Sequence, residues 1–200
     1  MALPGNVLVE PFQPAPFDEP DDIPRVPLTT DYELGGTALN DPSFGLQVKD
    51  WKFAYTDFDG KVFAAPAGGG VANTLFTRLG ITELSGAFDQ NMNPAVAFVD
   101  GLGAWLWYFD TVLNDYTFLE LPAGTRTPFL TMDDKRPTAN SYNDILLFYV
   151  LNTNLCYRQQ RNRFGIERIL YSFNGPEVDI LRVGMNKGLR VQIEVEGPGI

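Results

Sequence analysis

The sequence predicts an all-β fold: an antiparallel meander of short strands preceded by an extended, proline-rich N-terminal arm. Three observations favour it. Fifteen prolines and 19 glycines are spread over 200 residues, which suits strands and turns better than long helices. After about residue 45, short β-prone runs alternate with turn residues. Hydrophobic residues make up 44% of the chain and aromatic residues 13%, enough for one sizeable core.

Residues 1–45 form the predicted arm. Seven prolines fall between Leu3 and Thr30, and each proline fixes φ and removes a backbone donor. Large apolar residues, including Phe12 and Phe17, are interleaved there with an acidic group that contains Asp21 and Asp22. We expect this arm to lie on its own domain or on a neighbouring subunit, because solvated linkers seldom carry so many apolar residues. A purely solvated linker is the alternative.

Residues 46–200 form the predicted all-β domain. Turn residues that tolerate positive φ separate several of its strands, as at Asp59-Gly60, Asp100-Gly101, Asn152-Thr153-Asn154 and Asn186-Lys187-Gly188. The expected strands are 46–55, 61–65, 73–79, 82–88, 95–99, 104–109, 116–121, 128–132, 144–151, 154–160, 166–172, 178–183 and 189–195.

The domain contains about three repeated hairpin or blade units. A strand that ends in Phe or Met followed by Asp or Asn recurs at Phe88, Met132 and Met185, at spacings of 44 and 53 residues. Such a period is typical of four-stranded propeller blades, so we expect partial β-propeller-like blades. A β-sandwich or barrel is the alternative, because all hairpins share turn chemistry. Three blades cannot close a ring, and their open edges favour pairing with other chains.

Composition argues against an enzyme. The chain has no histidine, which removes the commonest general base and metal ligand. Its one cysteine, Cys156, permits no intramolecular disulfide and fits synthesis in a reducing compartment. We expect no catalytic residues, no cofactor and no metal site. The turn Asp57-Phe58-Asp59-Gly60 lacks the downstream Glu of an EF-hand loop.

Charge and hydropathy limit the partners. There is no signal-like segment near the start and no apolar run long enough to span a membrane, so we expect no membrane partner. The net charge of −10 and the pI near 4.4 argue against specific nucleic-acid binding, which needs a positive surface.

Charge is also uneven along the chain. Residues 1–60 hold eleven acids against three bases, while positive charge gathers in the last quarter, around 157–164. Ends of opposite sign favour head-to-tail contact between copies, and we therefore expect a homo-oligomer. The candidate subunit-interface residues are Phe12, Phe17, Asp21, Asp22, Arg158, Arg161 and Arg163.

A carbohydrate-binding β module is a rival hypothesis. It would use Trp51, Trp105, Trp107 and Tyr108, which would have to be exposed in a groove. At such positions in strands aromatic residues more often belong to the core.

Four motifs carry a resemblance to a known family: LNDPSFGLQV at 39–48, FDQNMNP at 88–94, MDDKR at 132–136 and YRQQRNRF at 157–164. Over roughly residues 35–195 the chain resembles a family of tailed-bacteriophage virion structural proteins. The resemblance implies a virion protein made in the host cytoplasm, with portal, tail or capsid proteins as partners. It implies a tail or head-to-tail subunit such as a collar, nozzle or adaptor, with capsid decoration or head fibre as the alternative. It supplies no catalytic residues.

Overall fold

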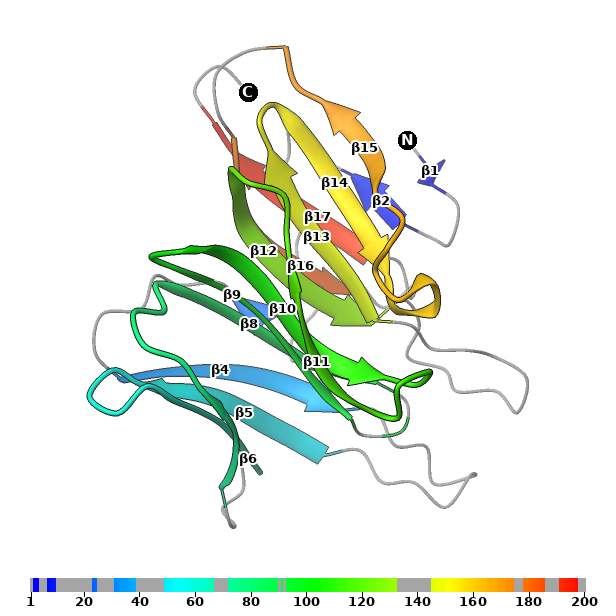
Figure 1. Cartoon of the computed structure of the whole chain (residues 1–200). Coiled ribbons are helices and arrows are strands. Elements are labelled where there is room, and N and C mark those ends of the chain that lie inside the picture. The colour runs from blue at the N-terminus through cyan, green and yellow to red at the C-terminus, as the bar shows by residue number, and fades with distance from the viewer. Residues whose placement is uncertain are drawn as a thin grey trace.

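The computed structural model confirms an all-β chain built mainly of antiparallel sheets (Figure 1). It describes residues 2–3, 7–9, 23–24, 31–38, 49–66, 72–89, 91, 93–132, 145–174, 178–185 and 191–197. Within these ranges there is no α-helix, and one short 3-10 helix, η2 (Gln160–Asn162), interrupts the strands.

The strands form three consecutive four-stranded meanders and one mixed sheet. The β4–β7 sheet contains β4 (Asp31–Ala38), β5 (Lys49–Thr56), β6 (Lys61–Pro66) and β7 (Asn73–Thr77). The β8–β11 sheet contains β8 (Glu83–Phe88), β9 (Pro94–Asp100), β10 (Gly103–Asp110) and β11 (Asp115–Glu120). The β12–β15 sheet contains β12 (Thr125–Met132), β13 (Ile145–Leu151), β14 (Asn154–Gln159) and β15 (Arg168–Ser172).

The fourth sheet, called the terminal sheet here, joins both ends of the chain. It contains β1 (Ala2–Leu3), β2 (Val7–Val9), β17 (Val191–Glu196), β16 (Asp179–Met185) and β3 (Ile23–Pro24), in that spatial order. β2 lies parallel to β17, whereas β3 lies antiparallel to β16. Strands from the predicted arm therefore flank both edges of the β16–β17 hairpin within the same chain.

All thirteen strands expected between residues 46 and 195 are present, with ends shifted by a few residues. The turn predicted at Asp59-Gly60 has Gly60 at a φ of 67°, and Asn152 has a φ of 56°. At the Asp100-Gly101 turn the positive φ falls on Gly103 instead. The predicted turn at 186–188 lies outside the described residues. β4 was not expected: it lies inside the predicted arm and pairs along its whole length with β5.

The repeat has a structural counterpart. Phe88, Met132 and Met185 are the last residues of β8, β12 and β16. β8 and β12 are the first strands of their meanders, and β16 begins the C-terminal hairpin. β4, β8, β12 and β16 lie side by side in that order. Each sheet is open, and the described strands form no closed barrel.

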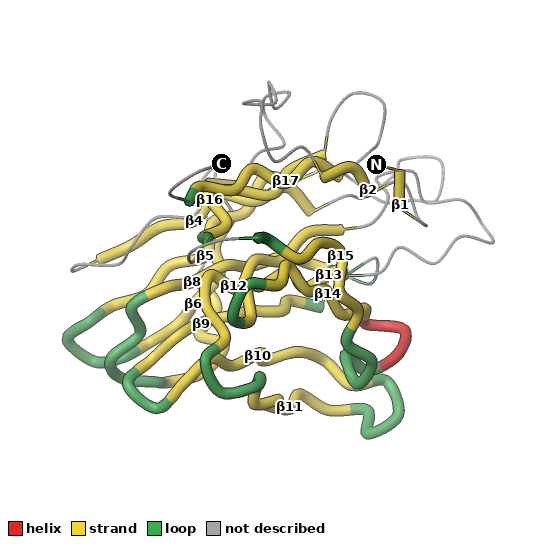
Figure 2. The backbone as a smooth tube through the Cα atoms, turned by 90° about the horizontal axis from the view of Figure 1, so that it is seen from above, coloured by secondary structure: helices red, strands yellow, loops and turns green. Residues whose placement is uncertain are grey.

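Three apolar cores separate the four sheets. Phe53 and Val62 of the β4–β7 sheet pack with Phe98 of the next sheet. The second core lies between the β8–β11 and β12–β15 sheets, and the third between the β12–β15 sheet and the terminal sheet. Figure 2 shows the last three sheets as successive layers, with β16 and β17 at the top and β10 and β11 at the bottom.

The central strand β13 explains how one sheet serves two cores. Its residues Ile145 to Val150 are all buried. Leu147 and Tyr149 face the second core, while Leu146 and Phe148 face the third. A strand buried on both faces has no polar face to show, which accounts for its unbroken apolar run.

Buried hydroxyls join the first strands of successive sheets. Ser85 Oγ on β8 accepts the Leu130 amide of β12 at 2.9 Å, and Thr127 Oγ1 on β12 accepts the Ile180 amide of β16 at 3.1 Å. Each bond gives a buried backbone amide a side-chain acceptor on the neighbouring sheet. The sheets are therefore tied together by hydrogen bonds as well as by apolar contact.

Candidate functional site

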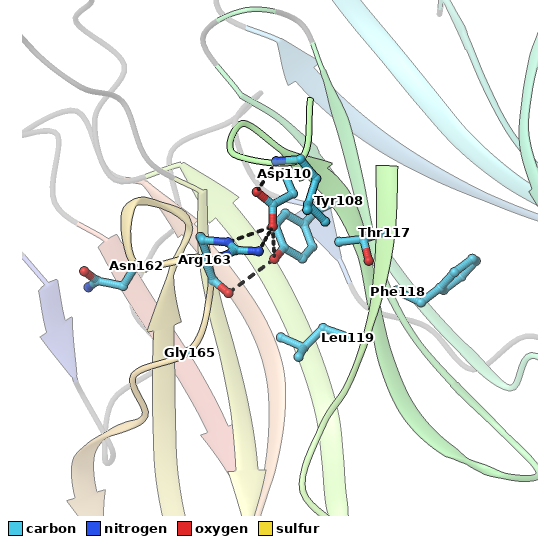
Figure 3. A pocket seen from close by; sticks show the side chains of 9 residues that line it. Tyr108, Asp110, Thr117, Phe118, Leu119, Asn162, Arg163 and Gly165 are labelled. Carbon is cyan, nitrogen blue, oxygen red and sulfur yellow. Dashed lines mark hydrogen bonds and ion pairs between the residues drawn. The ribbon is translucent and has the colours of Figure 1, made fainter. Parts of the chain in front are cut away.

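A hollow between β11 and the β14–β15 connection is the candidate site (Figure 3). Its volume is about 400 Å³. It lies where the β8–β11 sheet meets the β12–β15 sheet. Arg163, one of the arginines expected at a subunit interface, lines it, and Arg161 lies on the same turn. Its lining residues are Tyr108, Asp110, Leu113, Thr117, Phe118, Leu119, Asn162, Arg163 and Gly165.

Asp110 builds one wall of the hollow. It ends β10, and its Oδ1 accepts the backbone amides of Val112 at 2.8 Å and Leu113 at 3.2 Å. A carboxylate that accepts amides two and three residues ahead fixes a tight turn. The turn holds the side chains of Val112 and Leu113 in solvent, at 70% and 58% exposure.

The opposite wall comes from the turn after β14. Arg163 and Phe164 both adopt left-handed backbone conformations, with φ of 52° and 54°. Phe164 is fully buried, and its ring meets Tyr108 edge-on with centroids 4.9 Å apart. This aromatic anchor fixes the turn against the β8–β11 sheet, so the strained backbone of Arg163 is held in place by packing.

The two walls are joined by an ion pair. Arg163 donates to Asp110 Oδ2 from Nε at 2.7 Å and from Nη2 at 2.6 Å. The Asp110 side chain is fully buried, whereas that of Arg163 is 50% exposed. Burial alone would raise the pKa of Asp110, but hydrogen bonds from Arg163 and from the Val112 and Leu113 amides hold that pKa below its usual value. The same pair raises the pKa of Arg163.

Arg158 is engaged inside the chain. Its guanidinium donates to Tyr149 Oη at 2.8 Å, to the Phe164 carbonyl at 3.1 Å and to Glu167 Oε2 at 3.3 Å. Tyr149 in turn donates to Glu167. Burial, followed by the hydrogen bond to Glu167, raises the pKa of Tyr149. This network fixes the β14–β15 connection.

The seven predicted interface residues divide into three groups. Phe12, Phe17, Asp21 and Asp22 lie outside the described residues. Arg158 serves intramolecular packing, while Arg163 lines the hollow and stays half exposed. Arg161 lies on the exposed side of the same turn. The structure thus brings Arg161 and Arg163 to one surface.

Sequence reasoning missed the apolar part of this surface. Leu113 and Val112 are exposed on the β10–β11 turn, whereas the ring of Phe118 points away from Arg163 and packs edge-on against Phe76 and Phe98 (Figure 3). Two adjacent aliphatic residues inside a turn bounded by Asp110 and Asn114 were an available signal, because turns are usually polar. β11 is also the edge strand of its sheet.

The hollow combines apolar walls with polar groups at its rim. Its walls carry aliphatic and aromatic carbon, with guanidinium and amide donors at the rim. The one carboxylate, that of Asp110, is held by Arg163 and by two backbone amides. No group of three or more Cys, Asp or Glu side chains that could hold a metal ion gathers within the described ranges.

The aromatic residues of the carbohydrate hypothesis form no exposed platform in the described part of the chain. Trp107 is 6% exposed and Tyr108 is 4% exposed. The guanidinium of Arg78 covers the ring of Trp105, 4.8 Å from the ring centroid. The side chain of Trp51 lies outside the described residues.

No helix among the described residues is both long and apolar enough to cross a membrane. Comparison of the chain with models of protein families, with curated proteins and with solved structures gives no match.

Proposed function

We propose that this chain is a non-enzymatic structural subunit of a tailed-bacteriophage virion. Its place is the tail or the head-to-tail junction, as a collar, nozzle or adaptor subunit that assembles through subunit contacts. The observation that carries the proposal is the surface around Arg163, where exposed apolar side chains lie beside a half-exposed guanidinium. Apolar groups rimmed by polar ones mark protein contact surfaces.

The scaffold supports a mechanical role. Each sheet acts as a blade of a partial propeller, with β4, β8, β12 and β16 as neighbouring inner strands. Three apolar cores and the buried hydroxyl bonds of Ser85 and Thr127 join successive blades. A unit tied together at each sheet interface transmits force without internal rearrangement.

The motif resemblance to phage virion proteins supplies the setting. Residues 157–160 of its last motif run from β14 into η2, and Arg163 closes the motif's turn beside the hollow. The motif thus coincides with the candidate interaction surface. The FDQNMNP motif lies next to it, because Gln160 Nε2 donates to Asp89 Oδ2 at 3.2 Å.

Locating the protein in assembled particles tests the proposal. We expect a C-terminally tagged chain to co-purify with phage particles and to appear at the tail or neck in electron cryo-microscopy. Label on the outer capsid surface would replace the tail role with decoration. Particles that form and infect normally without the protein would overturn the proposal.

Removal of residues 1–30 tests the arm. Because β1, β2 and β3 cover the edges of the β16–β17 hairpin, the truncated protein should keep its β signal by circular dichroism but lose stability and incorporation into particles. Wild-type incorporation of the truncated protein would remove the arm from the assembly role.

A further inference from the structure

Three large apolar side chains are exposed together at one end of the molecule. Phe58 on the β5–β6 turn is 99% exposed, Leu102 on the β9–β10 turn is 78% exposed, and Leu79 after β7 is 66% exposed. We call these three residues the tip patch. Exposed aromatic and aliphatic groups that lie together on a soluble protein often mark contact sites.

Hydrogen bonds join the three turns that carry the tip patch. The Arg78 amide donates to the Gly60 carbonyl at 2.7 Å, and the Arg78 guanidinium binds Asp100 Oδ2 at 2.5 Å. Asp100 Oδ1 in turn accepts the Leu102 amide at 2.8 Å. Gly60 lies so close to Leu79 that an added Cβ would be 2.9 Å from its side chain. The three turns therefore present one preformed surface.

The tip patch and the hollow lie at opposite ends of the β8–β11 sheet. β10 runs from the Leu102 turn to the Asp110 turn over eight residues, which is roughly 26 Å for an extended strand. Figure 1 shows the turn between β5 and β6 at the left and the turn between β10 and β11 at the right. The two surfaces cannot meet within one molecule.

We infer that the Phe58 turn of one copy inserts into the hollow beside Arg163 of a second copy. The inference rests on the proposed function as a self-assembling subunit and specifies the contact. Leu113, Leu119 and Tyr108 offer apolar walls to the Phe58 ring. The hollow, about 400 Å³, is larger than the roughly 150 Å³ cavity known to hold a benzene ring.

Charges around the ring match as well. Asp57 and Asp59 flank Phe58 on the turn, and Arg163 and Asn162 lie at the hollow. Asp59 is paired with Lys61 at 2.6 Å, so Asp57 is the carboxylate that the turn offers to a second copy. Asp57 is exposed and accepts one hydrogen bond from Tyr55 Oη at 3.2 Å, and a carboxylate has room for several more. Arg163 binds Asp110 through Nε and Nη2, and a guanidinium has five N–H donors. A carboxylate from a second copy can therefore join the pair.

A contact between two different surfaces of identical chains is heterologous. Such contacts propagate head to tail, and they close into a ring when the rotation per subunit allows it. An open row of subunits ends in an unpaired tip patch on one side and an empty hollow on the other. Assembly therefore continues until a ring closes, or as an open helical filament where the rotation does not allow closure.

Sedimentation velocity of the full chain over a concentration series tests the contact. Wild type should associate beyond a dimer. Phe58→Asp and Leu113→Asp should each remain monomeric, with self-affinity lowered about 30-fold or more, the loss expected for a central aromatic contact. Ile169→Asp, at a 58% exposed position on β15 outside both surfaces, should associate like wild type.

Mixing the two defective variants gives the sharpest result. Phe58→Asp keeps an intact hollow and Leu113→Asp keeps an intact tip patch, so the mixture should form one-to-one dimers that stop there. Circular dichroism and urea midpoints of each variant confirm that it is folded. A mixture that stays monomeric overturns the inference, as does a wild-type chain that is monomeric throughout. Phe58→Asp association equal to wild type also overturns it. Particle incorporation, which tests the proposed function, is measured separately, so failure of this contact is distinguishable from failure of the proposed function.

Discussion

Arg163 binds a single oxygen of Asp110, Oδ2, with two of its nitrogens, at 2.7 and 2.6 Å, across the boundary between two sheets. Arg78 and Asp100 form a matching pair at 2.5 Å between the first two meanders, at the other end of the β8–β11 sheet. In both pairs the buried carboxylate also caps its own turn. One carboxylate therefore fixes a loop and joins two sheets.

Acid should weaken the protein through these two carboxylates. Burial opposes ionisation of Asp100 and Asp110, but the hydrogen bonds from arginine and from backbone amides outweigh burial and hold each pKa below its usual value. A carboxyl with a lowered folded pKa stabilises the fold above its unfolded pKa of about 3.9, and this stability is lost as pH falls through the folded pKa.

Urea midpoints measured between about pH 7 and pH 3 check this. Asp110→Asn should have a lower midpoint than wild type at neutral pH and a smaller fall in acid. Asp115→Asn, the same charge change at an exposed position, should follow the wild-type curve. An unchanged acid dependence in Asp110→Asn would contradict the role of the pair.

Ser85→Ala should destabilise the fold by about 1–3 kcal/mol, because it leaves the buried Leu130 amide without its acceptor. Urea unfolding should show a lower midpoint with an unchanged slope. Ser172→Ala, at an exposed serine bonded to Asn154 Oδ1 at 2.7 Å, is the matched control and should change stability by less than about 0.5 kcal/mol. Equal effects at both serines would refute the idea that Ser85 joins the sheets.

Gly86→Ala should also destabilise the fold, by about 1–3 kcal/mol. A Cβ at Gly86 would lie 2.4 Å from the buried ring of Phe53 on the neighbouring sheet. Gly101→Ala is the control, since a Cβ there meets nothing within 4 Å. The loss should shrink in a Phe53→Leu background, because the smaller side chain leaves room. If Gly86→Ala cost as much stability in the Phe53→Leu background as in wild type, contact with the Phe53 ring would not be the cause.

Local sequence pattern could predict the strands but not the partners across sheets. Turn residues and β-prone runs marked every strand after residue 46, and the recurrence at Phe88 and Met132 marked the ends of two first strands. β4 was missed because its Gly35-Gly36 pair has low strand propensity. Only its pairing with β5 makes it a strand.

The candidate site depended still more on distant contacts. Asp110 and Arg163 are 53 residues apart, and no periodicity relates them. The sequence marked the arginine-rich motif as distinctive, but it could not show that Arg158 binds Tyr149 and Glu167 while Arg163 remains half exposed. The direction of a side chain in a turn depends on the backbone conformation, and Phe164 has a left-handed one. Composition does not reveal which residues adopt that conformation.

Cys156 should be unreactive in the folded protein. Its thiol is buried, and burial, together with the charge of Glu167, raises its pKa to about 11. Because the thiolate is the nucleophile, iodoacetamide should label the native chain only as fast as it unfolds, and labelling should speed up through the urea transition. A cysteine placed at exposed Thr153 on the β13–β14 turn, in a Cys156→Ala background, should react at the rate of a free thiol. Native wild-type labelling as fast as that control would show that the core between the β8–β11 and β12–β15 sheets opens without global unfolding.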